Sequence, residues 1–521
     1  MPLFKIDDLR AWTAGEWTNL SKKYPDIKGF SIDSRKMEPN FAFVALSAER
    51  DGHDFAADAV KNGAVAIIAS KPLEVDAPVL VVKDTLKALQ TIAKFHRLRF
   101  EFPVIGITGS CGKTTTKEFI TKLISWKKPI ATKGNLNNEI GVPITLTRID
   151  IRDNMSAVIE AGVAAPGQMI ELAQMIEPDL AVITTVTPAH MEGFGEIGNI
   201  AKEKAELAMH LAPEGWALFH SNLLSWKAFE ELPCKKAVLA PSNAPEIRAD
   251  LVFRYTLEES GGITRVDLCI EDGKEYYFEI PTLSKGLTEN ALLAIATSLM
   301  LGASEEQLAA KLPLLEPAPM RGAVVSTEKS HFYADCYNAS PASMKDSLKR
   351  FEILSTDAPR LYVLGGMEEL GLASLRYHKD IGENVAPREG DKAALVGKNS
   401  EIYKSAMLEK GWKEENIFVF DNAIDALKAT EFFEGWVFLK GSRVCELENA
   451  LPNEVREKLS LDPQEIPAEE EPEEEIDEEL PESEIIDDDD DDEFDSEDFE
   501  DDFDDDDENG DDFDDEEDDR F

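Results

Sequence analysis

The sequence predicts an α/β fold with three folded domains and an acidic tail, on three observations. Short apolar runs typical of buried strands alternate with stretches of helical period, and this alternation starts afresh twice. A glycine-rich segment joins one of the strands to a helix. Beyond residue 460 the composition changes to nearly continuous Asp and Glu. We expect an N-terminal domain at 1–100, a central domain at 101–318, a C-terminal domain at 319–460 and a tail at 461–521.

The first domain is expected to be a small α/β unit. Its strand candidates are the apolar runs FAFVAL (41–46), AVAIIAS (64–70) and PVLVVKD (78–84). Stretches of helical spacing separate these runs, so helices should cover the sheet.

The central domain should contain a mostly parallel sheet. PVIGIT (103–108) is a buried-strand candidate that leads into the glycine-rich segment, and KTTTKEFITKLISWKK (113–128) follows with apolar residues at helical spacing. Two further strand candidates, at 156–162 and 179–186, are each separated by amphipathic helix patterns. This rhythm predicts helices on both faces of the sheet.

The same alternation of strand and helix patterns starts again near Pro319 and predicts another, smaller α/β domain. Its strand candidates lie at 360–366, 392–397, 416–420 and 436–442.

The acidic tail accounts for most of the net charge of −50. Residues 465–521 contain 38 acidic residues and one basic residue, Arg520, whereas residues 1–464 carry a net charge of only −13. Dense like charges repel, and five isolated Phe residues cannot form a core, so we expect disorder. The tail is interpreted as a solubilising appendage, with binding to an unidentified basic partner as the alternative. Its charge argues against nucleic-acid binding, which requires positive groups.

The cysteine pattern and the apolar runs indicate a cytoplasmic protein. Five scattered cysteines without a C-x-x-C pair argue against a disulfide framework and against a zinc site. We identify neither a signal peptide at the N-terminus nor an apolar run long enough to span a bilayer, and therefore expect no membrane insertion.

The glycine-rich segment GITGSCGKTTT (106–116) does not have the common phosphate-loop spacing G-x-x-x-x-G-K-[ST]. That spacing would need a glycine at position 107, where Ile107 stands. The pattern is instead T-G-x-x-G-K-T, with Gly109 and Gly112. Ile107 therefore belongs to the strand, and the loop begins after it.

This loop has the composition of a nucleotide phosphate site. Glycines let backbone N–H groups converge on phosphate oxygens, and the following helix adds its positive dipole end. Lys113 can reach the terminal phosphates, and the Thr114 hydroxyl suits Mg²⁺. We expect the nucleotide to contact Gly109, Ser110, Cys111, Gly112, Lys113, Thr114 and Thr115.

Three further residues are candidates for the chemistry. Glu160 ends the apolar run SAVIE, which places a carboxylate at the carboxyl end of a strand, where α/β sheets bind ligands. His190 follows another buried strand candidate. Lys204 lies on a predicted helix with other charged residues, and composition alone favours a solvated helix face for it.

Several motifs together resemble the Mur ligases and their relatives, the folylpolyglutamate synthases. The loop spacing carries the resemblance, together with SIDSRK (31–36), DGHDF (51–55), GNLNNEIGVPITL (134–146), HMEGFG (190–195), DCYNASPASM (335–344) and KGSR (440–443). The match spans about residues 25 to 450 and is nearest the branch that joins D-alanyl-D-alanine to UDP-N-acetylmuramoyl-tripeptide. The resemblance implies an N-terminal UDP-substrate domain, a central ATPase-like domain and a Rossmann-like C-terminal ligase domain. We also expect a monomer.

The implied reaction is amide ligation in peptidoglycan precursor synthesis. ATP phosphorylates the acceptor carboxylate, and the amine of the dipeptide attacks the acyl phosphate to release phosphate. Such chemistry needs ATP, Mg²⁺ and positive groups that hold both anions.

The resemblance also assigns roles to single residues. It places Lys113, Glu160, His190 and Lys204 in the catalytic centre, and Thr114, Glu160, His190 and Lys204 at the metal, with Lys204 at a position that several Mur ligases carbamylate. It implies ATP contacts from Asn290, Arg321 and Asp335. It implies substrate contacts from Ser34, Arg35, Asn137, Asn138, Asn338, Lys440, Ser442 and Arg443, with segment 51–54 as a further candidate for the UDP-sugar.

Four positions depart from the pattern of this branch. Gly366 replaces an Asp, Gly286 a His, Gln168 a Glu and Ser340 an Asn.

Two alternatives stay open: another Mur or folylpolyglutamate-type ligase, or a degenerate homologue that acts as a scaffold. The N-terminal motifs argue against the first, and the intact loop and metal residues argue against the second.

Overall fold

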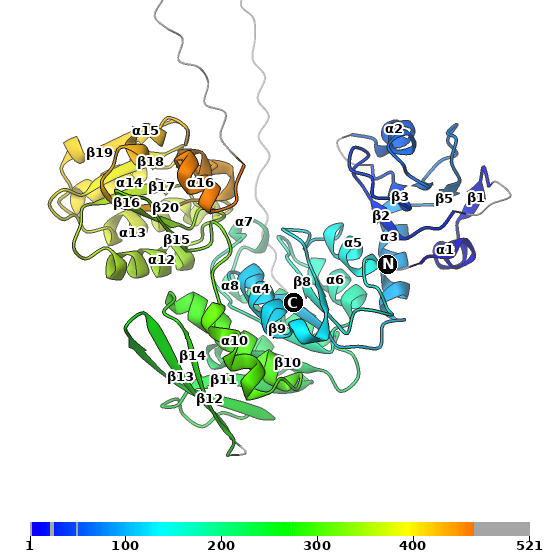
Figure 1. Ribbon diagram of the computed structural model, residues 1–521, viewed down its shortest axis with the longest axis horizontal. Helices are drawn as coiled ribbons and strands as arrows, with labels where there is room; N and C mark the ends of the chain where they lie inside the picture. Colours follow the sequence, from blue (N-terminus) through cyan, green and yellow to red (C-terminus); the bar gives the residue numbers. More distant parts are fainter. Residues whose placement is uncertain (1–2, 21–24, 48–49, 272, 463–521) are drawn as a thin grey trace, which may run out of the picture. The chain divides into compact units, whose positions relative to one another are not determined.

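The structure is a computed structural model that describes residues 3–20, 25–47, 50–271 and 273–462. All of the expected acidic tail beyond Asp462 lies outside the described residues. Figure 1 shows three sheets, each with its own helices.

The N-terminal sheet has the strand order β1-β5-β4-β3-β2. Strands β2 to β5 pair in parallel, and β1 pairs antiparallel with β5. All three expected strands are present, and β3 and β4 are buried throughout. The elements are α1 (Ile6–Thr13), β1 (Glu16–Thr18), β2 (Gly29–Ser31), β3 (Phe41–Val44), η1 (Gly52–Phe55), α2 (Ala56–Lys61), β4 (Ala66–Ala69), β5 (Val79–Val81) and α3 (Thr85–Arg97).

The central sheet has the order β14-β13-β12-β11-β10-β9-β6-β8-β7. Its strands from β6 to β12 pair in parallel, as expected, whereas β12, β13 and β14 form an antiparallel extension that the sequence reading did not predict. The strands are β6 (Val104–Thr108), β7 (Pro129–Ala131), β8 (Ser156–Glu160), β9 (Leu180–Ile183), β10 (Trp216–His220), β11 (Lys235–Pro241), β12 (Leu251–Ser260), β13 (Ile263–Ile270) and β14 (Glu275–Pro281).

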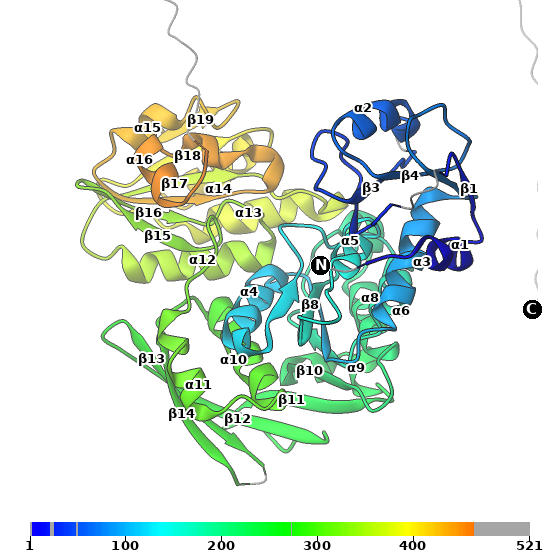
Figure 2. The same cartoon turned by 45° about the vertical axis from the view of Figure 1, so that its right-hand side comes forward.

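Helices cover both faces of the central sheet. Ile105 and Ile107 of β6 belong to one apolar cluster, and Ile159 of β8 belongs to the cluster on the other side. Helix α10 packs alongside α4 (Figures 1 and 2). The helices are α4 (Lys113–Leu123), η2 (Ser125–Lys127), α5 (Gly141–Thr147), α6 (Gln168–Ile176), α7 (Met191–Phe194), α8 (Ile197–Met209), η3 (Ser221–Ser225), α9 (Lys227–Glu230), α10 (Lys285–Met300), α11 (Glu305–Ala309) and η4 (Leu312–Leu314).

The C-terminal sheet has the order β15-β16-β20-β17-β18-β19, and only its edge strand β15 pairs antiparallel. All four expected strands are present. The elements are β15 (Ala323–Ser326), β16 (Ser330–Ala334), α12 (Pro341–Leu354), β17 (Arg360–Gly365), η5 (Gly371–Ala373), α13 (Ser374–Asn384), β18 (Lys392–Val396), α14 (Ser400–Glu409), η6 (Glu414–Asn416), β19 (Ile417–Phe420), α15 (Leu427–Glu431), β20 (Gly435–Lys440), η7 (Arg443–Cys445), η8 (Leu447–Ala450) and α16 (Asn453–Lys458).

The domain boundaries near residues 100 and 319 stay predictions, and each falls between two sheets. Among the helices that the structure describes, none combines the length and apolar character needed to cross a bilayer.

Candidate active site

The glycine-rich loop leaves the buried strand β6 and ends at the first turn of α4, as expected. Both of its glycines are required by close neighbours. A Cβ on Gly109 would lie 1.8 Å from the Thr184 hydroxyl oxygen, and a Cβ on Gly112 would lie 2.5 Å from Asn290 Oδ1. Gly112 also has a φ of 83°, which side chains disfavour.

The loop is tied to the segment that follows β9. The Ser110 N–H donates to the Thr185 carbonyl at 2.8 Å, and the Cys111 N–H donates to Thr185 Oγ1 at 3.1 Å. The Ser110 hydroxyl donates to the Thr187 carbonyl at 2.9 Å. Sequence reasoning did not identify this threonine segment, because its partners lie more than 70 residues away.

Lys113 and Thr114 start α4, whose first N–H groups have no carbonyl of the helix before them and face an anion favourably. Lys113 Nζ donates to the Gly109 carbonyl at 2.8 Å and so folds over the loop. Burial lowers the pKa of Lys113, and the negative charge of Glu160 opposes this shift.

Glu160 is the carboxylate of the site. It ends β8, is 2% exposed, and accepts hydrogen bonds from the Thr114 hydroxyl at 3.0 and 3.2 Å. Asn137 Nδ2 donates to Glu160 Oε1 at 2.8 Å. Asn137 was expected to contact the sugar or peptide, but its amide nitrogen is engaged by Glu160.

His190 lies at the start of α7 with a φ of 52°. Its Nδ1 forms an ion-pair contact with a carboxylate oxygen of Glu369, in a geometry that leaves Nδ1 without a hydrogen bond. Burial lowers the pKa of His190, while Glu369 raises it and Lys113 and Lys204 lower it further. The sequence reading missed Glu369, because nothing local links its segment to His190.

Lys204 lies on α8, as expected, but is buried and only 2% exposed. The solvated face that composition favoured is therefore wrong for this residue. Burial, together with the charge of Lys113, lowers the pKa of Lys204 to about 7. The adjacent Glu203 accepts hydrogen bonds from the Gly167 and Met169 N–H groups at 2.8 and 2.6 Å, at the start of α6.

Thr114 and Glu160 fit a magnesium ion by their chemistry. Both present hard oxygen atoms, which Mg²⁺ prefers, and this ion usually takes only one or two carboxylates and keeps several waters. In the part of the chain that the structure describes, His, Cys, Asp and Glu side chains form no group of three or more arranged to hold a metal.

The expected ATP-binding residues beyond the loop have defined partners. Asn290 lies on α10 beside Gly112, as described above. The guanidinium of Arg321 stacks over the Tyr337 ring, 4.1 Å from its centroid, and its positive charge contributes to the lowered pKa of Lys113. Asp335 follows β16 and accepts a hydrogen bond from Lys440 Nζ at 2.7 Å.

Two C-terminal residues expected to contact substrate are engaged within the protein. Lys440 is 1% exposed and also donates to the Asn338 carbonyl at 3.1 Å, so it holds the turn after β16. The Ser442 hydroxyl accepts from the Glu368 N–H at 2.9 Å. Both side chains therefore have partners within the protein, and their substrate contacts stay predictions.

Arg443 and Asn338 are more accessible. The Arg443 side chain is 53% exposed and pairs with Glu448, which raises the pKa of Arg443 through their hydrogen bond. Asn338 is exposed, and its Oδ1 accepts from the Ala339 N–H at 2.9 Å.

The expected N-terminal contacts differ in accessibility. Ser34 is buried, whereas the Arg35 side chain is 83% exposed and pairs with Asp33 at 2.9 Å. Asn138 Oδ1 accepts at 2.9 Å from the N–H of Gly141, the first residue of α5. Within segment 51–54, His53 is buried and its Nε2 accepts the Ser70 N–H at 2.9 Å, so this imidazole holds the backbone.

Two of the four departures preserve a structural role. Gln168 Oε1 accepts the Ala164 and Ala165 N–H groups at 2.8 and 3.1 Å, a role that a carboxylate oxygen could also fill. Ser340 caps α12, and its hydroxyl lies 3.0 Å from Cys111 Sγ of the phosphate loop.

At the two departure positions where this chain has glycine, a neighbouring side chain lies close to the backbone. The Gly286 N–H donates to Asp346 Oδ2 at 3.1 Å, and a Cβ there would lie 2.9 Å from the same oxygen. A Cβ on Gly366 would lie 2.5 Å from Asn399 Nδ2. In this chain Asp346 and Asn399 are packed where the larger side chains of the family pattern would stand.

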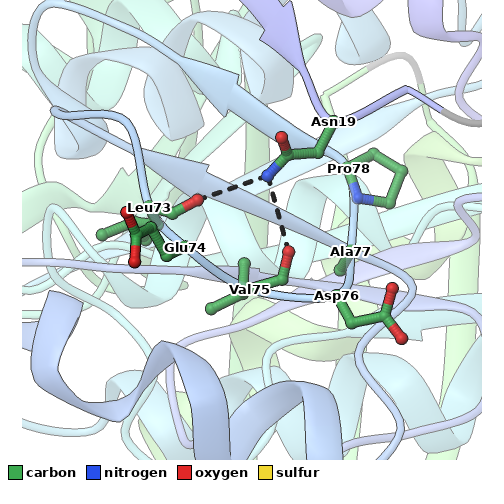
Figure 3. Close-up of a pocket in the computed structure, with 7 residues that line it drawn as sticks. All are labelled: Asn19, Leu73, Glu74, Val75, Asp76, Ala77 and Pro78. Carbon is green, nitrogen blue, oxygen red and sulfur yellow. Dashed lines mark hydrogen bonds between the residues drawn. The ribbon is translucent and has the colours of Figure 1, made fainter.

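A cavity of about 650 Å³ lies in the N-terminal unit, but it contains none of the expected site residues. Figure 3 shows the Asn19 side chain pointing towards the Leu73 and Val75 carbonyls, to which its amide nitrogen donates at 3.3 and 3.4 Å. The remaining lining residues are Glu74, Asp76, Ala77 and Pro78. We assign the chemistry to the phosphate loop instead, where Lys113, the Thr114 hydroxyl and the Glu160 carboxylate lie together.

A phosphate loop in the middle of three α/β units, with a carboxylate against its threonine, defines a class of nucleotide-dependent enzymes. Family models for the Mur ligase family catalytic domain, the Mur ligase middle domain and the Mur ligase glutamate ligase domain match residues 26–97, 107–298 and 320–443. The chain belongs to the Mur ligase family.

Individual relatives agree with this assignment. The chain is 32% identical to the UDP-N-acetylmuramoyl-tripeptide–D-alanyl-D-alanine ligase of Escherichia coli, over 73% of this chain and 83% of that one. It resembles the solved structure of MurF from Acinetobacter baumannii with a TM-score of 0.74 and 27% identity, over 88% and 99% of the two chains. It also resembles the MurF ligase of Thermotoga maritima, solved in complex with ADP, with a TM-score of 0.68 and 26% identity over 83% and 98%.

Proposed function

We propose that this chain is the ATP-dependent ligase that joins D-alanyl-D-alanine to UDP-N-acetylmuramoyl-tripeptide, giving the UDP-pentapeptide, ADP and phosphate. The observation that carries the proposal is the contact of the Thr114 hydroxyl with Glu160, 3.0 Å apart at the start of α4, next to Lys113. The E. coli relative named above is a ligase for these two substrates, and the Thermotoga relative binds ADP.

The chemistry follows from the charges of the site. The tripeptide carboxylate attacks the terminal phosphate of ATP, so that an acyl phosphate forms and ADP leaves. The dipeptide amine then attacks the acyl carbon, loses a proton and expels phosphate. The role of Lys113 is to neutralise the phosphates, and the N–H groups at the start of α4 bind them.

Thr114 and Glu160 would hold Mg²⁺, and this ion would neutralise the crowded phosphate charge. Lys204 is suited to carbamylation, since a pKa of about 7 leaves a large fraction of neutral amine at neutral pH. Of the two C-terminal cations expected to contact substrate, Lys440 is buried and Arg443 is half exposed, so Arg443 is the candidate to pair with a dipeptide carboxylate. Arg35 is the exposed N-terminal candidate for the UDP group. We expect a monomeric cytoplasmic enzyme.

The direct test is phosphate release and product mass with purified full-length protein, ATP, Mg²⁺, UDP-muramoyl-tripeptide and D-Ala-D-Ala. Tripeptides ending in lysine and in diaminopimelate are assayed in parallel, and L-Ala-L-Ala serves as the control dipeptide. We expect a pentapeptide product with D-Ala-D-Ala only. Absence of product with both tripeptides would overturn the proposal, and glutamate addition to a folate would favour the folylpolyglutamate-type alternative.

A further inference from the structure

Lys117 is a buried cation in the phosphate-loop helix. It lies in the second turn of α4, four residues after Lys113, and is only 1% exposed. Burying an ammonium group is costly unless it has close partners. Lys117 Nζ donates to the Thr132 carbonyl at 2.7 Å and lies 2.9 Å from a Glu118 carboxylate oxygen.

Thr132 connects Lys117 to the carboxylate of the site. It directly follows β7 and is 2% exposed. While its carbonyl accepts from Lys117, its hydroxyl oxygen accepts the backbone N–H of Glu160 at 3.0 Å. One residue therefore links the buried ammonium to the backbone of Glu160.

Thr132 also begins the segment that carries the second support of Glu160. Five residues further on, Asn137 donates its amide N–H to Glu160 Oε1 at 2.8 Å. The Asn137 carbonyl in turn accepts the Gly162 N–H at 2.8 Å, two residues after Glu160. Lys117 thus anchors the start of a chain segment, residues 132–137, that contacts both the backbone and the carboxylate of Glu160.

We propose that Lys117 is a positioning residue for Glu160. The inference rests on the proposed function, in which Glu160 acts at the magnesium site. Lys117 touches no reacting atom in this scheme. It holds Thr132, and Thr132 holds the end of the strand that orients the carboxylate of Glu160. Groups that orient metal-binding side chains commonly affect metal affinity strongly when they are removed.

The test measures binding of a non-hydrolysable ATP analogue to full-length protein by calorimetry, with and without Mg²⁺, beside thermal unfolding. Lys117→Met keeps the length of the side chain without its charge, and Thr132→Val removes only the hydroxyl that Glu160 uses. Each should weaken the Mg²⁺-dependent part of binding about 10- to 100-fold. Binding without Mg²⁺ should change less than about twofold, because the loop glycines and Lys113 are untouched.

Two further variants sharpen the result. Lys117→Arg, which retains a cation donor, should recover most of the Mg²⁺-dependent binding. Lys122→Met is the matched control, because Lys122 lies on the same helix but is exposed, and it should behave as wild type. The double variant Lys117→Met/Thr132→Val should lose no more than the worse single variant, since both act through Thr132.

An equal loss of binding with and without Mg²⁺, or wild-type binding in both single variants, would overturn the positioning role. If Lys117→Met does not fold, Thr132→Val still decides whether Thr132 positions Glu160, and wild-type binding in that variant would overturn the role of Lys117, which acts only through Thr132. Nucleotide binding requires neither the tripeptide nor the dipeptide. A failure of the ligation assay would therefore contradict the proposed substrates and leave this test intact.

Discussion

The side-chain amide of Asn290 lies directly against the backbone of Gly112. A Cβ added to Gly112 would lie 2.5 Å from Asn290 Oδ1 and 2.8 Å from Nδ2. The two residues come from neighbouring helices, because Gly112 precedes α4 and Asn290 lies on α10. The phosphate loop and the Asn290 amide are therefore packed together, so the expected phosphate contacts of the loop lie beside the expected ATP contact of Asn290.

Gly112→Ala should lower ATP affinity and turnover about 100-fold, since even a displacement of about 1 Å in a site can have such an effect. Gly262→Ala is the matched control, because Gly262 also has a φ of 83° but no atom within 4 Å of an added Cβ. The control should lose only about 1–2 kcal/mol of stability from backbone strain. Calorimetric ATP binding and thermal unfolding separate the two effects, and equal ATP affinity in both variants would contradict the packing argument.

Lys113→Ala should reduce kcat/KM for ATP about 100- to 1000-fold, as expected when one charged group that stabilises the transition state is removed. Phosphate release under saturating second substrates measures this. Lys122→Ala, on the same helix, should retain full activity. Ligation that survives Lys113→Ala would show that the loop is wrongly assigned.

Glu369→Gln should impair turnover through His190. The carboxylate of Glu369 contacts His190 Nδ1, and a carboxylate there favours a proton on that nitrogen. We expect about a tenfold loss in kcat with little change in ATP binding, as is typical when the partner of a site histidine is removed. The ¹⁵N chemical shifts of His190 report the change of tautomer directly. Glu401→Gln, an exposed glutamate of the C-terminal sheet unit, should change neither quantity.

His220 predicts a loss of stability in mild acid. It is 6% exposed, its Nε2 donates to the Glu289 carbonyl at 3.0 Å, and burial lowers its pKa to about 4. The unfolded chain takes up this proton near pH 6.5, whereas the folded chain does so only near pH 4. The contribution of neutral His220 to the stability of the fold is therefore fully present above pH 6.5 and is lost as the pH falls towards 4.

The size of this effect is about 3 kcal/mol, from the difference between the two pKa values. Denaturant unfolding of wild type and His220→Gln between pH 4 and pH 7.5 measures it. The variant keeps an amide donor for Glu289 but cannot titrate, so its stability should fall less steeply below pH 6.5. Parallel curves for the two proteins would contradict the assignment to His220.

Removal of the acidic tail should leave catalysis unchanged. The truncation should end after Asp462, because the Arg456 Nε donates to the Asp462 carbonyl at 2.8 Å and this contact would be kept. Steady-state kinetics of the full and truncated chains should agree within about twofold, since the residues assigned to the site all precede position 444. A large loss of turnover would instead indicate that the tail takes part in the reaction.

Local patterns were sufficient for the strands that form from strongly apolar runs, for the phosphate loop and for the position of Glu160. Each depends on neighbours in sequence: apolar runs for β6 and β8, and glycine spacing between Gly109 and Gly112 for the loop. The antiparallel strands β12 to β14 were not predicted. Strands β13 and β14 alternate buried and more exposed residues at one edge of the sheet, and that pattern does not specify their pairing.

By itself, the sequence determined the α/β class, the nucleotide loop and the family, because these depend on short motifs and on periodicity. Only the tertiary structure decided which polar side chains are available. In the folded chain Lys204 is buried, Lys440 donates a hydrogen bond to Asp335, and Asn137 donates one to Glu160. The tertiary structure also revealed the buried cation Lys117 behind the site. The reason is physical: a side chain's burial and partners depend on segments far apart in the chain, which no local spacing encodes.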